Sequence, residues 1–325
     1  MTALYPWLEP HLASIGEMLG RDRVPHALLL SGQPGMGKTA FAEAIAQLLL
    51  CEDRTPDHAP CGQCPGCIQF QAGSHPDFFS VRPEEDSSVI KVDAIRALGE
   101  KLVLASHRGG YKVTLLAPAE AMNLNAANSL LKTLEEPSDN TVLVLICTRP
   151  ARLPATIRSR CQQLRITAPR AAPGKAWLAD QLDEGQDAGL YLHLADGAPL
   201  EALRLAQAGV VEARREQFQS LLQVLDGRID PLALAVTWSK DESLQPIHWL
   251  RDWLMDLLRI GMTGQTDRIR SVDLQDALAA MATRLDSRAL FRQLEHINRT
   301  LRITDGILNR QLMTEDILLA WAAQE

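Results

Sequence analysis

The segment that most constrains the fold of this chain is the glycine-rich run Gly32-Gln33-Pro34-Gly35-Met36-Gly37-Lys38-Thr39. It fits the pattern G-x-x-x-x-G-K-[ST], follows an apolar run at 27–30 and precedes a helical pattern at 39–50. In that context backbone N–H groups close around phosphate oxygens, the Lys38 ammonium reaches the β- and γ-phosphates, and the Thr39 hydroxyl ligates Mg²⁺. The residues predicted to bind nucleotide here are Gly32, Gly35, Gly37, Lys38 and Thr39. The alternative is a glycine-rich turn that binds no ligand. This alternative affects the prediction of nucleotide binding more than the prediction of the fold.

Up to about Ile166, short β-rich runs alternate with helical patterns, as a parallel α/β sheet requires. The expected helices are Thr39–Leu50, Asp93–Ala105 and Asn125–Glu135, the last ended by Pro137. We therefore expect an α/β domain over residues 1–167. The expected strands are His26–Ser31, Asp77–Val81, Lys112–Ala117, Thr141–Thr148 and Gln162–Ile166.

Beyond a linker expected at Thr167–Gly174, no β-rich alternation remains. We expect a small helical domain over residues 168–207 and an all-α domain over residues 208–325. In Trp249–Leu258 the apolar side chains fall on one helical face. A packed helix core explains this stripe better than an interface, which is the alternative.

Length and charge narrow the class of protein further. The chain has 325 residues, about twice the roughly 150 of a typical domain, and 46% of them are hydrophobic, so several globular domains are expected. Residues 1–167 carry 16 basic and 17 acidic side chains, and residues 168–325 carry 17 and 23. Because neither half has the excess of Lys and Arg that neutralises phosphates, a role on DNA must be shared with partners. No apolar run suits a membrane span or a signal peptide, so we expect a cytoplasmic protein.

The end of the third expected strand departs from the pattern of hydrolysing enzymes. Such enzymes end this strand with an Asp that holds Mg²⁺, commonly followed by a Glu that polarises the attacking water. The corresponding positions here are Ala117 and Pro118. Glu120 is the nearby carboxylate that could replace the missing base, although it falls in the following turn. The chain is therefore predicted to bind nucleotide and to hydrolyse it poorly.

Four of the six cysteines, Cys51, Cys61, Cys64 and Cys67, lie within a short polar insert. Four thiolates complete a tetrahedral structural zinc site with no open position for chemistry, and Gly62 and Gly66 allow the backbone to fold tightly around them. An iron–sulfur cluster is the alternative, since ligand softness alone does not separate the metals. His75 is expected to be a loop residue rather than a ligand. Cys147 and Cys161 are expected to be buried thiols.

Several segments together resemble the AAA+ clamp-loader family of bacterial DNA polymerase III. They span residues 25–161 and include Pro25–Leu30 (PHALLL), the four-cysteine insert, Ser74–Asp77 (SHPD), Asn125–Pro137 (NAANSLLKTLEEP) and Leu153–Cys161 (LPATIRSRC). The resemblance implies a P-loop AAA+ domain with a zinc module at about 51–67, a helical lid at 168–207 and an oligomerising collar at 208–325. It also implies a five-membered ring with tau/gamma and delta subunits, which places the sliding clamp on primed DNA with ATP and Mg²⁺ as cofactors. The chain would then be part of the DNA-directed DNA polymerase III holoenzyme, a nucleotidyltransferase.

Within that family the resemblance implies a role for Arg160, whose Ser-Arg-Cys motif supplies an arginine finger to the ATP site of a neighbouring subunit. Such a guanidinium stabilises charge that develops on the γ-phosphate. Arg158 is its expected structural companion, and chemistry alone does not separate the two. Thr148 matches the polar residue that senses the γ-phosphate, and a simple strand-end hydroxyl is the alternative.

Two departures from the motor subunits of this family indicate a non-hydrolysing, stator-like subunit. The first is the absence of carboxylates at residues 117 and 118. The second is Leu200, which stands where motor subunits carry a nucleotide-contacting arginine in the lid. Arg204, one turn further on, weakens the second of these arguments. The alternative is an ATP-hydrolysing motor similar to tau/gamma. An unrelated P-loop kinase that carries zinc would leave the LLKTLEEP and SRC segments unexplained.

Overall fold

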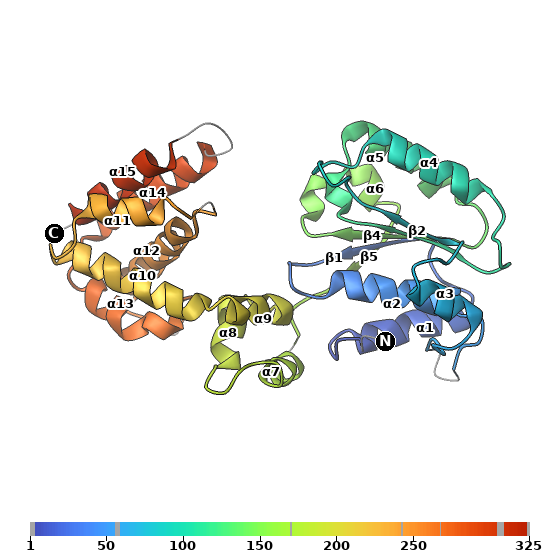
Figure 1. The fold of residues 1–325 in the computed structure, drawn as a ribbon, viewed down its shortest axis with the longest axis horizontal. Coiled ribbons are helices and arrows are strands. Elements are labelled where there is room, and N and C mark those ends of the chain that lie inside the picture. The colour runs from blue at the N-terminus through green and yellow to red at the C-terminus, as the bar shows by residue number, and fades with distance from the viewer. Residues whose placement is uncertain are drawn as a thin grey trace. The chain divides into compact units, whose positions relative to one another are not determined.

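The structure is a computed structural model that describes residues 4–55, 59–169, 171–241, 243–266, 268–303 and 309–323 (Figure 1). The chain divides into two compact units. The first comprises Met1–Gln181 with Asp196–Glu201, and the second comprises Leu182–Ala195 with Ala202–Glu325. No helix in the described parts of the chain is long and apolar enough to cross a membrane.

A five-stranded parallel sheet forms the centre of the first unit, in the order β2-β3-β4-β1-β5. Every residue of β1, β3 and β4 is buried, because helices cover both faces of a parallel sheet and leave water only at its edges. Each strand differs from its predicted range by one residue at one end, so the predicted α/β sheet is confirmed. The strands are β1 (Ala27–Ser31), β2 (Phe78–Val81), β3 (Lys112–Leu116), β4 (Thr141–Cys147) and β5 (Gln162–Arg165).

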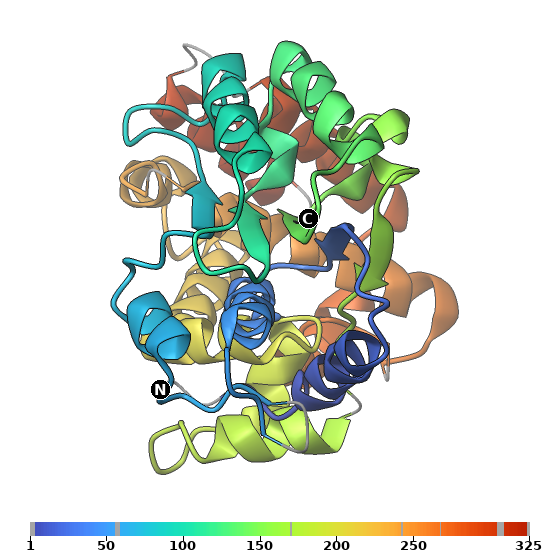
Figure 2. The same cartoon turned by 90° about the vertical axis from the view of Figure 1, so that its right-hand side faces the viewer.

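Helices cover the two faces of this sheet as separate layers (Figures 1 and 2). One layer contains α1 (Glu9–Gly20), α2 (Lys38–Leu50) and α3 (Pro65–Gln71), and the other contains α4 (Val92–Val103), α5 (Leu124–Glu135) and α6 (Ala155–Arg158). Each layer closes its own apolar core against the sheet. The periodicity predicted α2, α4 and α5, whereas α1, the seven-residue α3 and the four-residue α6 were not predicted. Two 3-10 turns, η1 (Ala119–Ala121) and η2 (Pro150–Arg152), follow β3 and β4.

The predicted linker at Thr167–Gly174 is only partly irregular, since helix α7 (Ala171–Ala179) begins inside it. Pro173 falls in the first turn of this helix, where a missing N–H costs no hydrogen bond. The prolines of this segment therefore predicted an irregular linker where a helix in fact begins.

All the regular secondary structure among the described residues of the second unit is helical. The predicted stripe on α12 (Gln245–Thr263) is core, because Leu250, Trp253, Leu254, Leu257 and Leu258 are buried there together with Trp238 and Trp321. The helices from α8 onward are α8 (Ala188–Leu194), α9 (Pro199–Gln207), which begins in the first unit, α10 (Val210–Leu225), α11 (Pro231–Trp238), α12 (Gln245–Thr263), η3 (Val272–Leu274), α13 (Gln275–Ala282), α14 (Ser287–Ile303) and α15 (Arg310–Ala322).

A buried charged network fixes the loop between α12 and α13. Asp256 on α12 is buried, and its two oxygens accept hydrogen bonds from the backbone N–H groups of Arg270 and Ser271, each at 2.9 Å. Beside it, Arg214 pairs with Asp273 at 2.9 Å and donates to the Ser271 hydroxyl at 2.6 Å. Each buried charge therefore has hydrogen-bond partners, which is the condition for keeping charges away from water.

We predict that Asp256→Ala destabilises the second unit by about 3 kcal/mol, because two buried N–H groups lose their acceptor. Asp256→Asn keeps one acceptor and should cost clearly less. Urea unfolding of the full chain, followed by tryptophan fluorescence, measures both effects. An unfolding midpoint that is unchanged in Asp256→Ala would contradict this account.

Candidate functional site

The phosphate loop has the backbone geometry that its glycines predict. The loop leaves β1 after Ser31, and α2 begins at Lys38. Gly35 and Gly37 adopt φ angles of 74° and 79°, which side chains rarely tolerate. A Cβ on Gly32 would lie 2.3 Å from the carbonyl oxygen of Ile166, so only glycine fits where the loop passes β5. The three glycines predicted from the motif thus each have a structural reason.

The Lys38 ammonium lies inside the loop. Its Nζ donates hydrogen bonds of 2.7 Å to the carbonyl oxygens of Gly32 and Gln33, and the side chain is buried. Burial lowers the pKa of Lys38, while the nearby Glu120 and Cys147 act in the opposite direction. A bound phosphate would offer this ammonium stronger, charged acceptors in place of the two carbonyl oxygens.

A cavity of about 750 Å³ opens beside the loop. The loop residues from Pro34 to Thr39 form one wall, and Thr148 and Leu200 also line the cavity. Leu200 lies close to the loop, since its N–H donates to the carbonyl oxygen of Gly35 at 3.1 Å. The structure thus brings Gly35, Gly37, Lys38, Thr39 and Thr148 together around one cavity, and Gly32 lies at the start of the loop.

Sequence reasoning missed the contribution of the N-terminal segment and of the residue after β2. Tyr5 and Arg82 both line the cavity. Trp7 supports the loop from behind, since its indole N–H donates to the Met36 carbonyl oxygen at 3.1 Å and its ring stacks on Tyr5 at 5.0 Å. The aromatic pair at residues 5 and 7 was the signal in the sequence that could have indicated this wall.

Ala117 and Pro118 line the cavity where hydrolysing enzymes place carboxylates, and no Asp or Glu is among its described lining residues. Glu120 lies behind this wall. Its Oε1 accepts hydrogen bonds from the backbone N–H groups of Thr148 at 2.9 Å and Arg149 at 3.1 Å. Burial raises the pKa of the Glu120 carboxyl, but hydrogen bonds from backbone N–H groups outweigh it and lower the pKa overall. Glu120 therefore holds the turn after β4 through Oε1, and it is not among the described residues that line the cavity.

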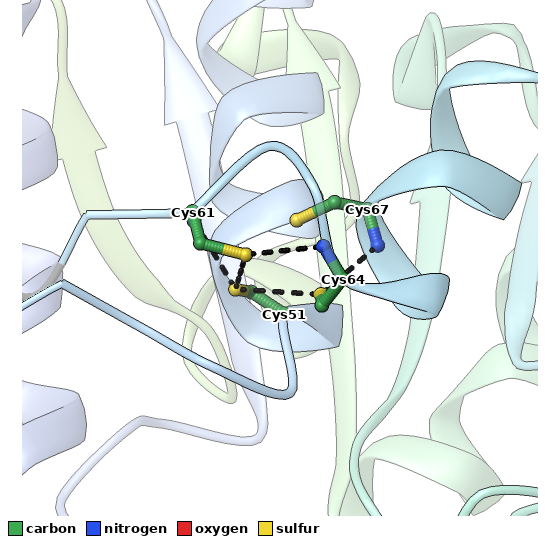
Figure 3. Close-up of side chains that lie close together, drawn as sticks. All are labelled: Cys51, Cys61, Cys64 and Cys67. Atoms are coloured by element: carbon green, nitrogen blue, oxygen red, sulfur yellow. Dashed lines mark hydrogen bonds between the residues drawn. The ribbon is translucent and has the colours of Figure 1, made fainter.

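The four cysteines of the insert converge on one point (Figure 3). Their sulfur atoms all lie within 4.8 Å of one another, and Cys51 Sγ is 3.6 Å from Cys61 Sγ and 3.9 Å from Cys64 Sγ. Zn–S bonds of about 2.3 Å separate the sulfurs of a tetrahedron by about 3.8 Å, so the cluster fits this metal. All four thiols are free of disulfides.

Backbone N–H groups favour the thiolate form at Cys64, whereas burial raises the pKa of the Cys51 and Cys67 thiols. The N–H groups of Glu52 and Cys67 both donate to Cys64 Sγ at 3.4 Å. Burial raises the pKa of the Cys64 thiol, but these hydrogen bonds outweigh it and bring the pKa down to about 6. Gly66 packs so closely that a Cβ would lie 2.4 Å from the Leu50 carbonyl oxygen, and Gly62 has a φ of 75°. Both glycines thus have the role predicted for them.

His75, Cys147 and Cys161, which the sequence predicted to be structural, are not part of the cysteine cluster. His75 is a buried loop residue whose Nδ1 accepts a hydrogen bond from the Asp77 N–H at 3.1 Å. Cys147 and Cys161 are buried, as predicted, and burial raises the pKa of the Cys161 thiol to about 11.

Arg160 lies just after the short helix α6, with its side chain 37% exposed. Its guanidinium pairs with Glu135 at 2.7 Å and donates to the Thr156 carbonyl oxygen at 3.0 Å. Arg158 is half-buried, and its Nε is buried without a hydrogen-bond partner among the described residues. Of the two arginines, Arg160 is therefore the more exposed.

Comparison with known proteins places these features in a family. Residues 9–170 match the family model described as DNA polymerase III, delta subunit, and residues 209–323 match the model of its C-terminal part. The DNA polymerase III subunit delta' of Pseudomonas aeruginosa is 37% identical over 327 residues, covering 99% of this chain and 98% of the relative. The same subunit of Escherichia coli is 35% identical and covers 97% of this chain and 94% of its own length.

A solved structure agrees at the level of the fold. The DNA polymerase III gamma subunit-related protein of Thermotoga maritima superimposes with a TM-score of 0.52 at 18% identity, covering 96% of this chain and 99% of its own. The order of a parallel-sheet domain followed by helices is thus shared. The near full-length identity to the curated relatives is more specific, and this chain belongs to the DNA polymerase III delta' family.

Proposed function

We propose that this chain is the non-hydrolysing, stator-like subunit of the DNA polymerase III clamp loader, acting in the cytoplasm. It would assemble with tau/gamma and delta subunits in a five-membered ring and help place the sliding clamp on primed DNA. The observation that carries this proposal is the cavity at the phosphate loop, which is complete on its phosphate side and has Ala117 and Pro118 in place of carboxylates.

The loop supports binding of ATP with Mg²⁺. Lys38 and Thr39 line the cavity together with Thr148, which follows β4. These groups would contact the phosphates and the metal ion, because an ammonium, a hydroxyl and backbone N–H groups are the ligands that such loops offer. Without a carboxylate to position the attacking water or to complete the Mg²⁺ coordination shell, hydrolysis would remain slow. An ATP-hydrolysing motor similar to tau/gamma is the competing proposal, and ATPase measurements separate the two.

The position of Arg160 supports its role as an arginine finger for a neighbouring subunit. The side chain lies at the surface, and its partner Glu135 is half-exposed. An exposed ion pair of this kind contributes no more than about 1 kcal/mol in water, so a phosphate of higher charge in a dry interface can displace the carboxylate. The finger would then act on ATP that another subunit binds.

The cysteine cluster supports a structural zinc ion. Cys51, Cys61, Cys64 and Cys67 fill all four positions of a tetrahedron, which leaves no site for a substrate. The ion would hold helix α3, whose start lies between Cys64 and Cys67, against the end of α2.

Zinc content is the first test. We predict about one zinc ion per chain and a clear loss of thermal stability on chelation, because a structural zinc site contributes folding free energy directly. Cys64→Ser should lose the metal, whereas Cys161→Ser, a buried cysteine outside the cluster, should retain it. Elemental analysis and thermal unfolding measure both effects, and iron in place of zinc would favour the cluster alternative.

ATP turnover is the second test. We expect the isolated chain to bind a fluorescent ATP analogue and to hydrolyse ATP at no more than background rate, with binding weakened at least about tenfold in Lys38→Ala. Ala117→Asp alone should restore no activity, since Pro118 remains. Steady hydrolysis by the unmodified chain that disappears in Lys38→Ala would support the motor instead.

Arg160→Ala tests the finger in the reconstituted complex. The variant should fold, hold zinc and assemble normally, while the DNA-stimulated ATPase of the complex falls partly, because the other sites keep fingers from their own neighbours. Arg165→Ala, an exposed arginine on β5, is the matched control, and Glu135→Gln should leave activity intact because it only releases the guanidinium. If Arg160→Ala is silent while Lys38→Ala abolishes the ATPase, the stator proposal is wrong.

A further inference from the structure

Strand β2 is an edge strand with unused backbone groups. It pairs only with β3 and stands at the end of the sheet. The Val113 N–H donates to the Asp77 carbonyl oxygen at 2.9 Å, and the Ala117 N–H donates to Val81 at 3.0 Å. In a parallel ladder alternate residues face the partner strand, so residues 77, 79 and 81 face β3, and Phe78 and Ser80 turn their backbone groups outward.

Three of these outward groups are open to a new partner. The Phe78 N–H donates to the His75 carbonyl oxygen, but the Phe78 C=O, the Ser80 N–H and the Ser80 C=O have no hydrogen-bond partner among the described residues. Ser80 is also exposed, although it lies in a strand. An exposed edge of this kind is a template for an added strand unless charges, proline or a covering segment protect it.

A cavity of about 770 Å³ adjoins this edge on the side of α2 and α3. Phe78 and Ser80 themselves line it, and the rings of Phe70 and Phe78 meet edge to face at 4.9 Å. Gln47 lines it as well, and its Nε2 is buried with no hydrogen-bond partner among the described residues. An acceptor that enters the cavity can satisfy this amide after a small rotation of the Gln47 side chain. Near the edge, Glu43 and Arg82 pair loosely at 3.9 Å, which leaves the lining without net charge.

We propose that the β2 edge and this cavity bind an uncharged, extended segment of a partner protein. The segment would add a strand to β2 through the backbone of Ser80, and would place one side chain with an apolar stem and an oxygen acceptor between Phe70 and Gln47. The backbone hydrogen bonds to the open edge would supply affinity, and the cavity would select the side chain. In strand addition, main-chain pairing generally provides affinity and side-chain pockets provide specificity. The proposal goes beyond the clamp-loader function above and depends on neither ATP turnover nor Arg160.

The proposal also assigns a purpose to the cysteine insert. Helix α3, which begins between Cys64 and Cys67, supplies Phe70 and Gln71 to one wall of the cavity. Holding this short helix against α2 keeps the two sides of the cavity at a fixed separation. A seven-residue helix is too short to be stable by itself, so the cysteine cluster is what fixes that wall.

Capped pentapeptides Ac-Thr-Val-X-Val-Thr-NH₂, with Gln or Leu at X, test the proposal on the full chain labelled with ¹⁵N. The Gln peptide should shift the Ser80 amide resonance, slow its hydrogen exchange, and bind more tightly than the Leu peptide. The same peptide with alternate backbone nitrogens methylated loses its strand donors and should bind at least about tenfold more weakly.

Two pairs of variants locate the site. Ser80→Pro removes the outward N–H without touching the bonds to β3 and should weaken the Gln peptide at least about tenfold, whereas Ser80→Thr should not. Gln47→Met should weaken the Gln peptide about tenfold and leave the Leu peptide within about twofold. No binding at millimolar peptide, equal binding of the methylated peptide, or a dimer formed by pairing of two β2 edges would each overturn the proposal.

Discussion

The parallel pairing of β1 between β4 and β5 is the constraint on which the first unit depends. Its register sets Ser31 beside Cys147 on one side and Arg165 on the other, so three chain segments leave the sheet at one edge. The phosphate loop therefore starts between the turn that carries Thr148 and the backbone of Ile166. Residue 32 must be glycine, because a Cβ there would collide with the Ile166 carbonyl oxygen. Because β1 is buried on both faces, a ligand can reach this part of the sheet only at the carboxyl ends of these strands.

Although Ala117 and Pro118 follow β3, a negative charge remains near the phosphate loop. Glu120 still acts on the Lys38 ammonium, but it does so from behind the cavity wall, where its Oε1 is occupied by the N–H groups of Thr148 and Arg149. A carboxylate held in this way steadies the turn after β4. Lys38 lines the cavity, whereas no Asp or Glu is among its described lining residues.

Sequence periodicity predicted every strand of the sheet to within one residue, because buried parallel strands are continuous apolar runs bounded by turns. It did not predict α3, which has too few residues for a periodic signal and depends on the cysteine turn at Cys64. The phosphate loop has the backbone geometry that its motif predicts, and the four cysteines lie together as their spacing predicts, since each pattern encodes its own local geometry. Tyr5 and Arg82 were missed, because their place at the cavity depends on packing between segments far apart in the sequence.

The surface pair between Arg160 and Glu135 is compatible with the role proposed for Arg160 in an assembly. Both groups are partly exposed, so water screens their attraction and the pair can open at small cost. Glu135 ends helix α5, and Arg160 follows α6, so the pair holds the guanidinium beside the end of α5 instead of free in solution. Contact with a neighbouring subunit would exclude water and strengthen every charge interaction at that surface. If Arg160 acts as proposed, a triphosphate at that surface would displace Glu135 from the guanidinium, because a triphosphate carries more charge than one carboxylate.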